Sequence, residues 1–580
     1  MKLQVGFDDF GKVRSKKLDF VDKTLLVKEI LDNDNVEVSV IARPRRFGKT
    51  FNLSILHHFL APEVNHMETK GMFDGLKIAK VDNGSYMQYQ GKFPVVFISF
   101  KEINAGSYDL ACSGLYELIV NIFDKYNYLK DSDKLSKRDK WLLRRILHKE
   151  ANQAEIYGSL RFLTSILFKY FNVKPWLLID EYDTPIQSGY LHGYYNEIVN
   201  FMRGILGAAL KTNPYLERAV ITGILRIAKE SLFSGLNNVK VYSLLHPQYS
   251  QHFGFTEEEV GVLLKQTGVD SAQEEVRTWY NGYVFGGTIV YNPWSIVNYI
   301  NDGVLKPYWV NTSDNQLIRD LLIKSDPKFK EGFELLLQDK TIEEIIDENM
   351  MFGDLKNNNE AIWSLLLMSG YLQAIASTIN QQGQTICTCA IPNWEVRTLY
   401  YNIIAGWLGN GQGMGWYQSF LTDLLNGDIP KFTEDFAQVL SQTISVYDVA
   451  HNPEAFYHGF MLGLTAGVDQ KQYEIKSNRE SGAGRYDIAI MPKDVSRLAI
   501  ILELKSIAPP KYSKKKLADF LDTTLAGEAQ KALAQIDHNQ YTLELAQRGI
   551  VNIVKLGIAF SGKSFRIASE NSEIRQIAKR

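Results

Sequence analysis

The sequence contains little cysteine, almost no net charge and no long apolar run. Three of its 580 residues are cysteines, and Cys387 and Cys389 lack the histidine spacing that would complete a zinc site. Such sparse cysteine excludes a small secreted domain built on disulfides and predicts a reduced, cytoplasmic chain. The first residues include acids and no apolar core, so we expect no signal peptide, and no run of about 20 apolar residues predicts a membrane span.

The charges of the chain nearly cancel, with 64 lysines and arginines, 66 aspartates and glutamates and a net charge of −2. This balance excludes a globally basic nucleic-acid coat protein, so any nucleic-acid contact must be local. The lysine-rich segment 511–516 is one local candidate for neutralising backbone phosphates, although a solvated helix start explains it equally well. With 45% hydrophobic and 22% charged residues, a chain of this length should form two or three globular domains.

Two apolar runs near the carboxyl end, 486–491 and 498–504, flank a turn-rich segment and predict a β-hairpin. If the turn centres near Val495, Asp487 lies across from Glu503, and Lys505 shares the face of Glu503. Two carboxylates and an ammonium on an otherwise apolar strand pair are costly to bury without a partner, and Mg²⁺ suits carboxylate oxygens. The cluster therefore predicts a magnesium site, with a surface salt bridge as the alternative.

A second pattern lies near the amino end, where a strand-like run, 36–42, leads into Arg43-Pro44-Arg45-Arg46-Phe47-Gly48-Lys49-Thr50 and then an apolar helical pattern. Strand, loop and helix in this order predict a phosphate-binding loop, with Lys49 reaching the β- and γ-phosphates and Thr50 holding Mg²⁺. Arg43 stands where the first glycine of such a loop is expected, which leaves the loop shape open. Arg45 and Arg46 add positive charge beside the phosphates.

Two further strand-like runs end in polar residues that would complete this site. The run 176–179 leads into Asp180 and Glu181, which predicts an aspartate for Mg²⁺ and a general base for the hydrolytic water. The run 219–225 contains Thr222 and is followed by Arg226, which would sense the γ-phosphate and stabilise transferred charge. Structural roles for Thr222 and Arg226 remain an equal alternative.

The acid, then acid-x-lysine arrangement of Asp487, Glu503 and Lys505 resembles the PD-(D/E)XK nuclease superfamily. The resemblance implies that the two acids hold Mg²⁺ and that Lys505 activates water. It also implies a glutamine on the following helix, for which Gln535 within the periodic segment 529–541 is the candidate.

The segments 43–50, 179–185 and 222–238, with several aromatic motifs such as 279–283 and 391–396, resemble a family of AAA-ATPase-like bacterial proteins. Members of that family commonly carry a PD-(D/E)XK-like domain at the carboxyl end, and Arg43 in place of glycine is their usual form. The resemblance therefore implies ATP and Mg²⁺ as cofactors, with Arg43, Arg45, Arg46, Phe47, Gly48, Lys49, Thr50, Asp180, Thr222 and Arg226 around the nucleotide.

We expect an α/β protein with an AAA-like parallel sheet in 1–250, a helical lid in 251–330, a helical connector in 331–455 and a restriction-endonuclease-like α/β domain in 456–580. The function expected from these parts is an ATP-gated, Mg²⁺-dependent nuclease acting on DNA or RNA. The alternative is a nucleotide-dependent signalling or binding module whose last domain binds without cutting, and a phage-defence effector is a third reading. A homo-oligomer follows if Arg226 or another arginine acts across a subunit interface.

Overall fold

The computed structural model describes most of the chain in two compact units. The described residues are 6–225, 237–269, 272–312, 315–325, 327–337, 339–356, 358–408, 413–443, 472–481, 484–507, 520–561 and 564–573, with a few positions between 457 and 469. The first unit comprises Met1–Leu321 and Thr341–Val396, and the second comprises Leu322–Lys340 and Arg397–Arg580. None of the helices in these described stretches is long and apolar enough to cross a membrane.

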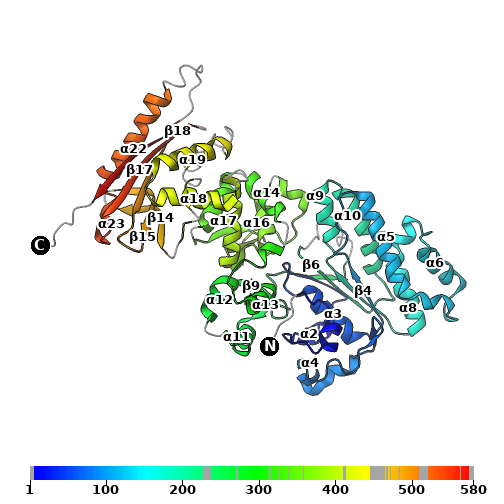
Figure 1. The fold of residues 1–580 in the computed structure, drawn as a ribbon. Helices are drawn as coiled ribbons and strands as arrows, with labels where there is room; N and C mark the ends of the chain where they lie inside the picture. Colours follow the sequence, from blue (N-terminus) through cyan, green and yellow to red (C-terminus); the bar gives the residue numbers. More distant parts are fainter. Residues whose placement is uncertain are drawn as a thin grey trace. The chain divides into compact units, whose positions relative to one another are not determined.

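A five-stranded sheet in the order β4-β5-β6-β1-β7 forms the centre of the first unit, and all of its strand pairs are parallel (Figure 1). Its strands are β1 Val38–Ala42, β4 Val95–Ser99, β5 Trp176–Asp180, β6 Arg218–Gly223 and β7 Val239–Tyr242. β1 and β5 are buried along their whole length, as expected for strands covered on both faces. Because all strands run the same way, their carboxyl ends meet at one edge, where ligands bind in such sheets.

Helices cover this sheet, and α3 packs against β4, β5 and β6 while α5, α8 and α10 gather together (Figure 1). The helices up to β6 are α1 Phe10–Ser15, α2 Leu25–Asp32, α3 Lys49–Leu60, α4 Lys77–Lys80, α5 Tyr108–Asp124, α6 Lys137–Leu147, α7 Gln153–Tyr157, α8 Ser159–Phe171, α9 Thr184–His192 and α10 Tyr195–Leu210. A short hairpin of β2 Glu63–Val64 and β3 Met67–Glu68 follows α3.

Two small antiparallel sheets complete the first unit, in the orders β8-β10-β9 and β11-β13-β12. Their elements are β8 Phe255–Thr256, α11 Glu257–Thr267, α12 Gln273–Tyr280, β9 Tyr283–Phe285, β10 Thr288–Tyr291, α13 Pro293–Asp302, α14 Gln316–Lys324, β11 Ile342–Ile345, α16 Asn359–Met368, β12 Gln373–Ile379 and β13 Thr385–Ala390. Thr256 caps α11 in a capping box with Glu259. The segments expected to be a helical lid and connector therefore contain helices together with short strands.

The second unit is built on a mixed sheet in the order β14-β15-β16-β17-β18, in which the pair β16 and β17 is parallel. Its elements are α15 Pro327–Leu337, α17 Trp394–Leu408, α18 Gly413–Leu425, α19 Ile429–Thr443, β14 Tyr473–Ser481, β15 Gly484–Pro492, β16 Ala499–Ser506, α22 Ala526–His538, α23 Leu543–Gln547, β17 Asn552–Ser561 and β18 Ser564–Glu573. Alternate residues of β16 enter two cores, with Ile501 in the core that contains residues of α22 and Leu502 in the core that contains residues of α18 and α19.

The α/β fold predicted from the sequence is confirmed, with a parallel sheet in the first 250 residues and a mixed sheet near the carboxyl end. The strand predicted at 36–42 forms as β1, and the hairpin predicted across Val495 forms as β15 and β16. The domain boundaries at 250, 330 and 455 stay predictions. The start expected at 456, the lysine-rich segment 511–516 and Arg226 lie outside the described residues.

Candidate functional site

The loop between β1 and α3 closes around the ammonium group of Lys49. Gly48 adopts a left-handed conformation with φ of 84°, which glycine tolerates at little cost, and directly precedes α3. Lys49 is 5% exposed, and its Nζ donates to the carbonyl oxygens of Arg43 and Pro44 at 3.0 and 2.9 Å. Burial lowers the pKa of Lys49, and the carboxylates after β5 oppose this shift. The loop thus offers a buried cation at a helix N-terminus, a combination that attracts phosphate.

The carboxylate of Asp180, at the end of β5, joins residues from three parts of the chain. Its Oδ2 accepts a hydrogen bond from Thr50 Oγ1 at 2.7 Å, and its Oδ1 accepts one from Thr222 Oγ1 at 2.6 Å. β6 lies between β1 and β5, which places Thr222 beside the other two residues. Burial raises the pKa of Asp180, while the two hydroxyl donors oppose this shift. The hydroxyl and carboxylate oxygens of Thr50 and Asp180 are the donors that Mg²⁺ prefers, so these residues fit the predicted ion.

Glu181 turns the chain out of the sheet directly after Asp180. Its φ of 51° is uncommon for a residue other than glycine, and its Oε2 accepts from Thr184 Oγ1 at 3.4 Å. Glu181 also interacts electrostatically with Lys49. The predicted base therefore lies near the predicted phosphate-binding lysine, and its role stays a prediction.

Asp183 is a site residue that the sequence did not indicate. It is 5% exposed, and its Oδ2 accepts from the backbone N–H groups of Ile224 and Leu225 at 2.8 and 3.0 Å. A Cβ on Gly223 would come within 2.7 Å of Asp183 Oδ1, so only glycine permits this approach. Burial raises the pKa of Asp183, and the two N–H donors oppose this shift. Asp183 thereby fixes the chain that follows Thr222.

The arginines of the loop point to three different places. Arg43 is fully buried, and its guanidinium donates to the carbonyl oxygens of Ala42, Tyr242, Ser243 and Gln248 at 2.7 to 3.3 Å. Arg45 Nη2 donates to Gln187 Oε1 of α9 at 2.9 Å, beside a pocket also lined by Trp309 and Tyr371. Arg46 is exposed and lies 4.2 Å from the centroid of the Trp294 ring. These contacts give Arg43 a structural role and leave Arg45 and Arg46 at the surface of the loop.

The segment 242–254 supports the phosphate-binding loop. Arg43 already donates to carbonyl oxygens of this segment, and two more hydrogen bonds join it to the loop and to α3. The side chain of Asn52 in α3 donates to the carbonyl oxygen of His252 at 2.9 Å, and the N–H of Gly254 donates to the carbonyl oxygen of Phe47 at 3.2 Å. Phe47 itself is fully buried against the rings of Tyr283 and Phe285, at 4.9 and 5.0 Å. Phe47 therefore packs into the protein and holds the loop in place.

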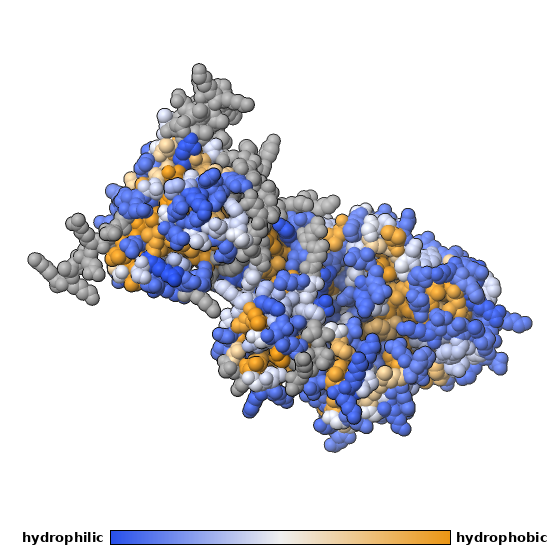
Figure 2. Space-filling view, in the orientation of Figure 1, coloured by the Kyte–Doolittle hydropathy of each residue, from blue (hydrophilic) through white to orange (hydrophobic). Residues whose placement is uncertain are grey.

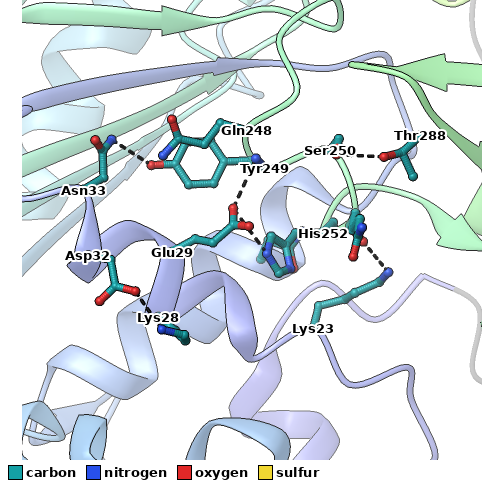
Figure 3. A network of polar contacts seen from close by, with 12 residues as sticks. Lys23, Lys28, Glu29, Asp32, Asn33, Gln248, Tyr249, Ser250, His252 and Thr288 are labelled. Atoms are coloured by element: carbon teal, nitrogen blue, oxygen red, sulfur yellow. Dashed lines mark hydrogen bonds and ion pairs between the residues drawn. The ribbon is translucent and has the colours of Figure 1, made fainter. Parts of the chain in front are cut away.

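A polar network fixes the same segment to α2 and α11 (Figure 3). Glu29 Oε2 accepts from the N–H of Tyr249 at 3.1 Å and lies 3.4 Å from His252 Nε2. Lys23 Nζ donates to the carbonyl oxygen of Gln251 and to Glu259 Oε2 at 2.7 and 2.6 Å. Burial lowers the pKa of Lys23, and Glu259 opposes this shift. The conformation of the phosphate loop thus depends on residues about 200 positions away.

Trp309 and Glu395 are two further residues that the sequence did not indicate. Trp309 Nε1 donates to the carbonyl oxygen of Arg45 at 3.0 Å. The backbone N–H of Trp309 donates to Glu395 Oε1 at 2.5 Å, and Ser295 Oγ donates to Glu395 Oε2 at 2.7 Å. Glu395 is fully buried in the first turn of α17, and burial raises its pKa to about 7. The buried carboxylate of Glu395 therefore fixes Trp309, which in turn donates to the phosphate-binding loop at Arg45.

The second site lies on the β15–β16 hairpin, where Ile488 pairs with Leu502 and the adjoining residues are Asp487 and Glu503. The predicted register is confirmed. Asp487 Oδ2 accepts from the backbone N–H of Leu504 at 2.7 Å, and Lys505 Nζ lies 3.7 Å from Glu503 Oε1. The structure thus brings both predicted carboxylates and the predicted lysine together.

Glu503 is a buried carboxylate whose charge Lys505 compensates only in part. It is 3% exposed, and its Oε2 has no hydrogen-bond partner. Burial and the nearby charge of Asp487 raise its pKa to about 8, and Lys505 only partly offsets them. Among the described residues no three carboxylate, histidine or cysteine groups cluster as a metal site. A metal here would therefore be held by two carboxylates with backbone and water oxygens, a set that suits Mg²⁺.

Gln535 of α22 reaches Glu503, as its Nε2 donates to Glu503 Oε1. This approach depends on Gly557, which pairs directly with Glu503 in the β16–β17 ladder. A Cβ on Gly557 would lie 2.3 Å from the backbone carbonyl oxygen of Ala529 in α22. Gly557 was not singled out from the sequence, because a lone glycine in a strand carries no sign of the helix that crosses it.

Comparison with known proteins identifies both parts of the chain. Residues 4–233 match a family described as predicted AAA-ATPase, and residues 452–570 match the PD-(D/E)XK nuclease superfamily. An uncharacterized protein from the vnfD 5′ region of Azotobacter chroococcum mcd 1 is 24% identical over 512 residues, covering 84% of this chain and 87% of the relative. The chain therefore carries an AAA-ATPase-like domain at its amino end and a PD-(D/E)XK nuclease-superfamily domain at its carboxyl end.

Proposed function

We propose that the protein is an ATP-gated nuclease, in which ATP and Mg²⁺ at the first site control Mg²⁺-dependent cleavage of DNA or RNA at the second. The observation that carries the proposal is the convergence of Asp487, Glu503, Lys505 and Gln535, with a Glu503 oxygen that has no partner. Lys505 and Gln535 both approach Oε1 of Glu503, so the buried Oε2 is the oxygen available to a metal ion. A cytoplasmic location stays part of this proposal.

At the first site Lys49 and the N-terminus of α3 would bind the phosphates, and Thr50 and Asp180 would hold Mg²⁺. Thr222 would then sense the γ-phosphate through its shared contact with Asp180, and Glu181 would orient water. Arg45 and Arg46 would add positive charge at the mouth of the loop.

At the second site Asp487 and Glu503 would hold a divalent ion, which polarises phosphate and lowers the pKa of water when bound. Lys505 is 31% exposed at its side chain, so it can reach substrate while its charge remains beside Glu503. Gln535 donates to Glu503 and would keep the other oxygen of that carboxylate directed at the ion.

The test is incubation of the full-length protein with plasmid, linear DNA and RNA, with Mg²⁺ and with or without ATP. We expect E503Q and K505A to abolish cutting and K49A to abolish ATP binding and ATP control. The matched controls are E434Q in α19 and K493A in the turn between β15 and β16, two exposed residues of the same unit that should leave activity unchanged. Cutting by E503Q or K505A at the wild-type rate would refute the nuclease assignment.

The signalling or binding module remains the second candidate, and the same experiment distinguishes it. Nucleic acid that is bound in an ATP-dependent manner by the wild type, without cleavage in any divalent metal, would favour the binding module over the nuclease.

A further inference from the structure

The outward face of α6 combines exposed cations with an exposed tryptophan. Asp139, Leu143 and Ile146 form the buried side of this helix. Lys137, Trp141 and Arg144 lie on the opposite side at helical spacings of four and three residues, and all three are exposed. Trp141 is 55% exposed, which is unusual for so large a ring. Figure 2 shows a largely hydrophilic surface where Figure 1 places α6, at the outer edge of the first unit.

The cations of this face are Lys137, Arg138, Lys140 and Arg144. None of the four forms an ion pair with an acidic side chain in the part of the chain that the structure describes. The neighbouring acids are already paired: Asp139 with Lys169 at 2.9 Å, Glu155 with Arg145 at 2.9 Å, and Glu117 with Lys149. Asp131 and Asp133 are the exposed acids that precede the helix. Four unpaired cations within eight residues repel one another and form a site for a polyanion.

Exposed aromatic rings gather beside the same helix. Within the described part of the chain the exposed aromatic residues are Tyr89, Tyr128, Trp141 and Phe171, so three of the four lie between 128 and 171. Tyr170 contacts the rings of Tyr128 and Phe171 at 5.7 and 4.8 Å, and Lys134 Nζ lies 5.0 Å from the Tyr170 ring. The bond between Asp139 and Lys169 ties this aromatic group to α6. This aromatic group therefore lies beside the side of α6 that carries Asp139, and Trp141 is the exposed ring on the outward side.

We propose that this surface, the α6 basic face (Lys137, Arg138, Lys140, Trp141 and Arg144), binds single-stranded nucleic acid. Lysine and arginine would neutralise the backbone phosphates. The Arg145 guanidinium lies 4.9 Å from the centroid of the Trp141 ring, and the part of this ring that stays exposed would stack on an unpaired base. The alternative polyanion, an anionic membrane, requires a helix with a broad apolar face. The apolar residues of α6, Leu143 and Ile146, are instead buried within the fold.

The proposed function places nucleic acid at the second unit. This binding surface lies on the first unit and shares with the proposed function only nucleic acid as the partner. Binding by the first unit would give the ATPase-like part its own contact with the substrate. The contact involves neither the phosphate loop nor Glu503, so it can be measured without ATP and without cleavage.

The test is equilibrium binding of the full-length protein to a labelled oligothymidylate and a matching RNA, in EDTA so that nothing is cut. Each phosphate contact to a single strand contributes about 0.7 to the slope of log K against log salt, so K137Q with R144Q should reduce that slope by about 1.4. W141A should weaken binding about 5-fold or more through lost stacking, and W141F should retain most of the affinity. The matched control is K265Q with R277Q, two exposed cations on α11 and α12 with the same change in charge.

Unchanged affinity and salt slope in the α6 variants would overturn the proposal, as would equal losses in the control. Binding to vesicles of anionic lipid, without binding to the oligonucleotides, would overturn it in favour of a membrane surface. Circular dichroism and the melting temperature show whether each variant is folded. If W141A does not fold, the affinity of W141F and the salt slope of K137Q/R144Q test the proposal. A wild type that binds through α6 but cuts nothing would refute the nuclease proposal and leave this inference intact.

Discussion

Replacing Glu395 by glutamine should remove a specific pH dependence of stability. Glu395 accepts hydrogen bonds from Trp309 and Ser295 in a fully buried position, where burial raises its pKa to about 7. Glutamine keeps the shape and an acceptor oxygen and carries no charge, so E395Q mimics the protonated acid. The comparison of wild type with E395Q therefore isolates the cost of ionising this carboxylate.

The sign follows from the raised pKa. The folded protein retains the proton up to about pH 7, whereas the unfolded chain loses it near the ordinary value of 4.5. The stability that the protonated Glu395 gives the folded protein is thus fully present below pH 4.5 and is lost as the pH rises through 7. The difference between about 7 and 4.5 corresponds to about 3 kcal/mol at about 1.4 kcal/mol for each pH unit.

The assay is denaturant unfolding across this pH range, followed by tryptophan fluorescence. We expect the stability of wild type relative to E395Q to fall by about 3 kcal/mol as the pH rises through the window. The control is E258Q, an exposed glutamate at the second position of α11 that corresponds to Glu395 at the second position of α17. Parallel curves for wild type and E395Q would refute the reasoning, because they would show that Glu395 ionises at its ordinary pKa.

Three further substitutions test the scaffolds of the two sites. R43A should lower the free energy of unfolding by more than about 3 kcal/mol, since it leaves several buried carbonyl groups unpaired, and an unchanged denaturation midpoint would contradict this. W309F removes the donor to the Arg45 carbonyl and should weaken ATP binding about 2- to 10-fold in calorimetry, whereas an unchanged affinity would show that this bond does not shape the loop. G557A should displace α22, lower the free energy of unfolding by about 1–3 kcal/mol and reduce cutting, and wild-type stability and cutting would show that α22 can shift freely.

The parts of the sites that could be predicted from the sequence are those that local pattern and strand geometry control. The turn near Val495 set the register that places Asp487 beside Glu503, because pairing in a hairpin follows from its turn. Thr50, Asp180 and Thr222 could be expected together, because the carboxyl ends of parallel strands meet at one edge.

Contacts between distant segments could not be predicted in the same way. The position of Arg43 depends on carbonyl groups about 200 residues away, and only the family resemblance placed this residue around the nucleotide. Glu395 reads as an ordinary acid in the first turn of a helix, and only the fold buries it under Trp309. The small sheet of β11, β12 and β13 lies within 331–455, where we expected a helical connector, and its strands pair residues that are up to about 45 positions apart.

We propose helix α17 as the route by which ATP would control cleavage. Its first three residues belong to the first unit, where Glu395 holds Trp309 and Trp309 holds the carbonyl oxygen of Arg45. From Arg397 onward it belongs to the second unit, where the guanidinium of Arg397 donates to the carbonyl oxygen of Leu337 and to Asp339. We therefore expect a change in the phosphate loop that displaces Trp309 to act on α17, whose residues are divided between the two units. If the signal takes this route, W309F lowers the stimulation of cutting even at saturating ATP, and full stimulation of W309F would exclude it.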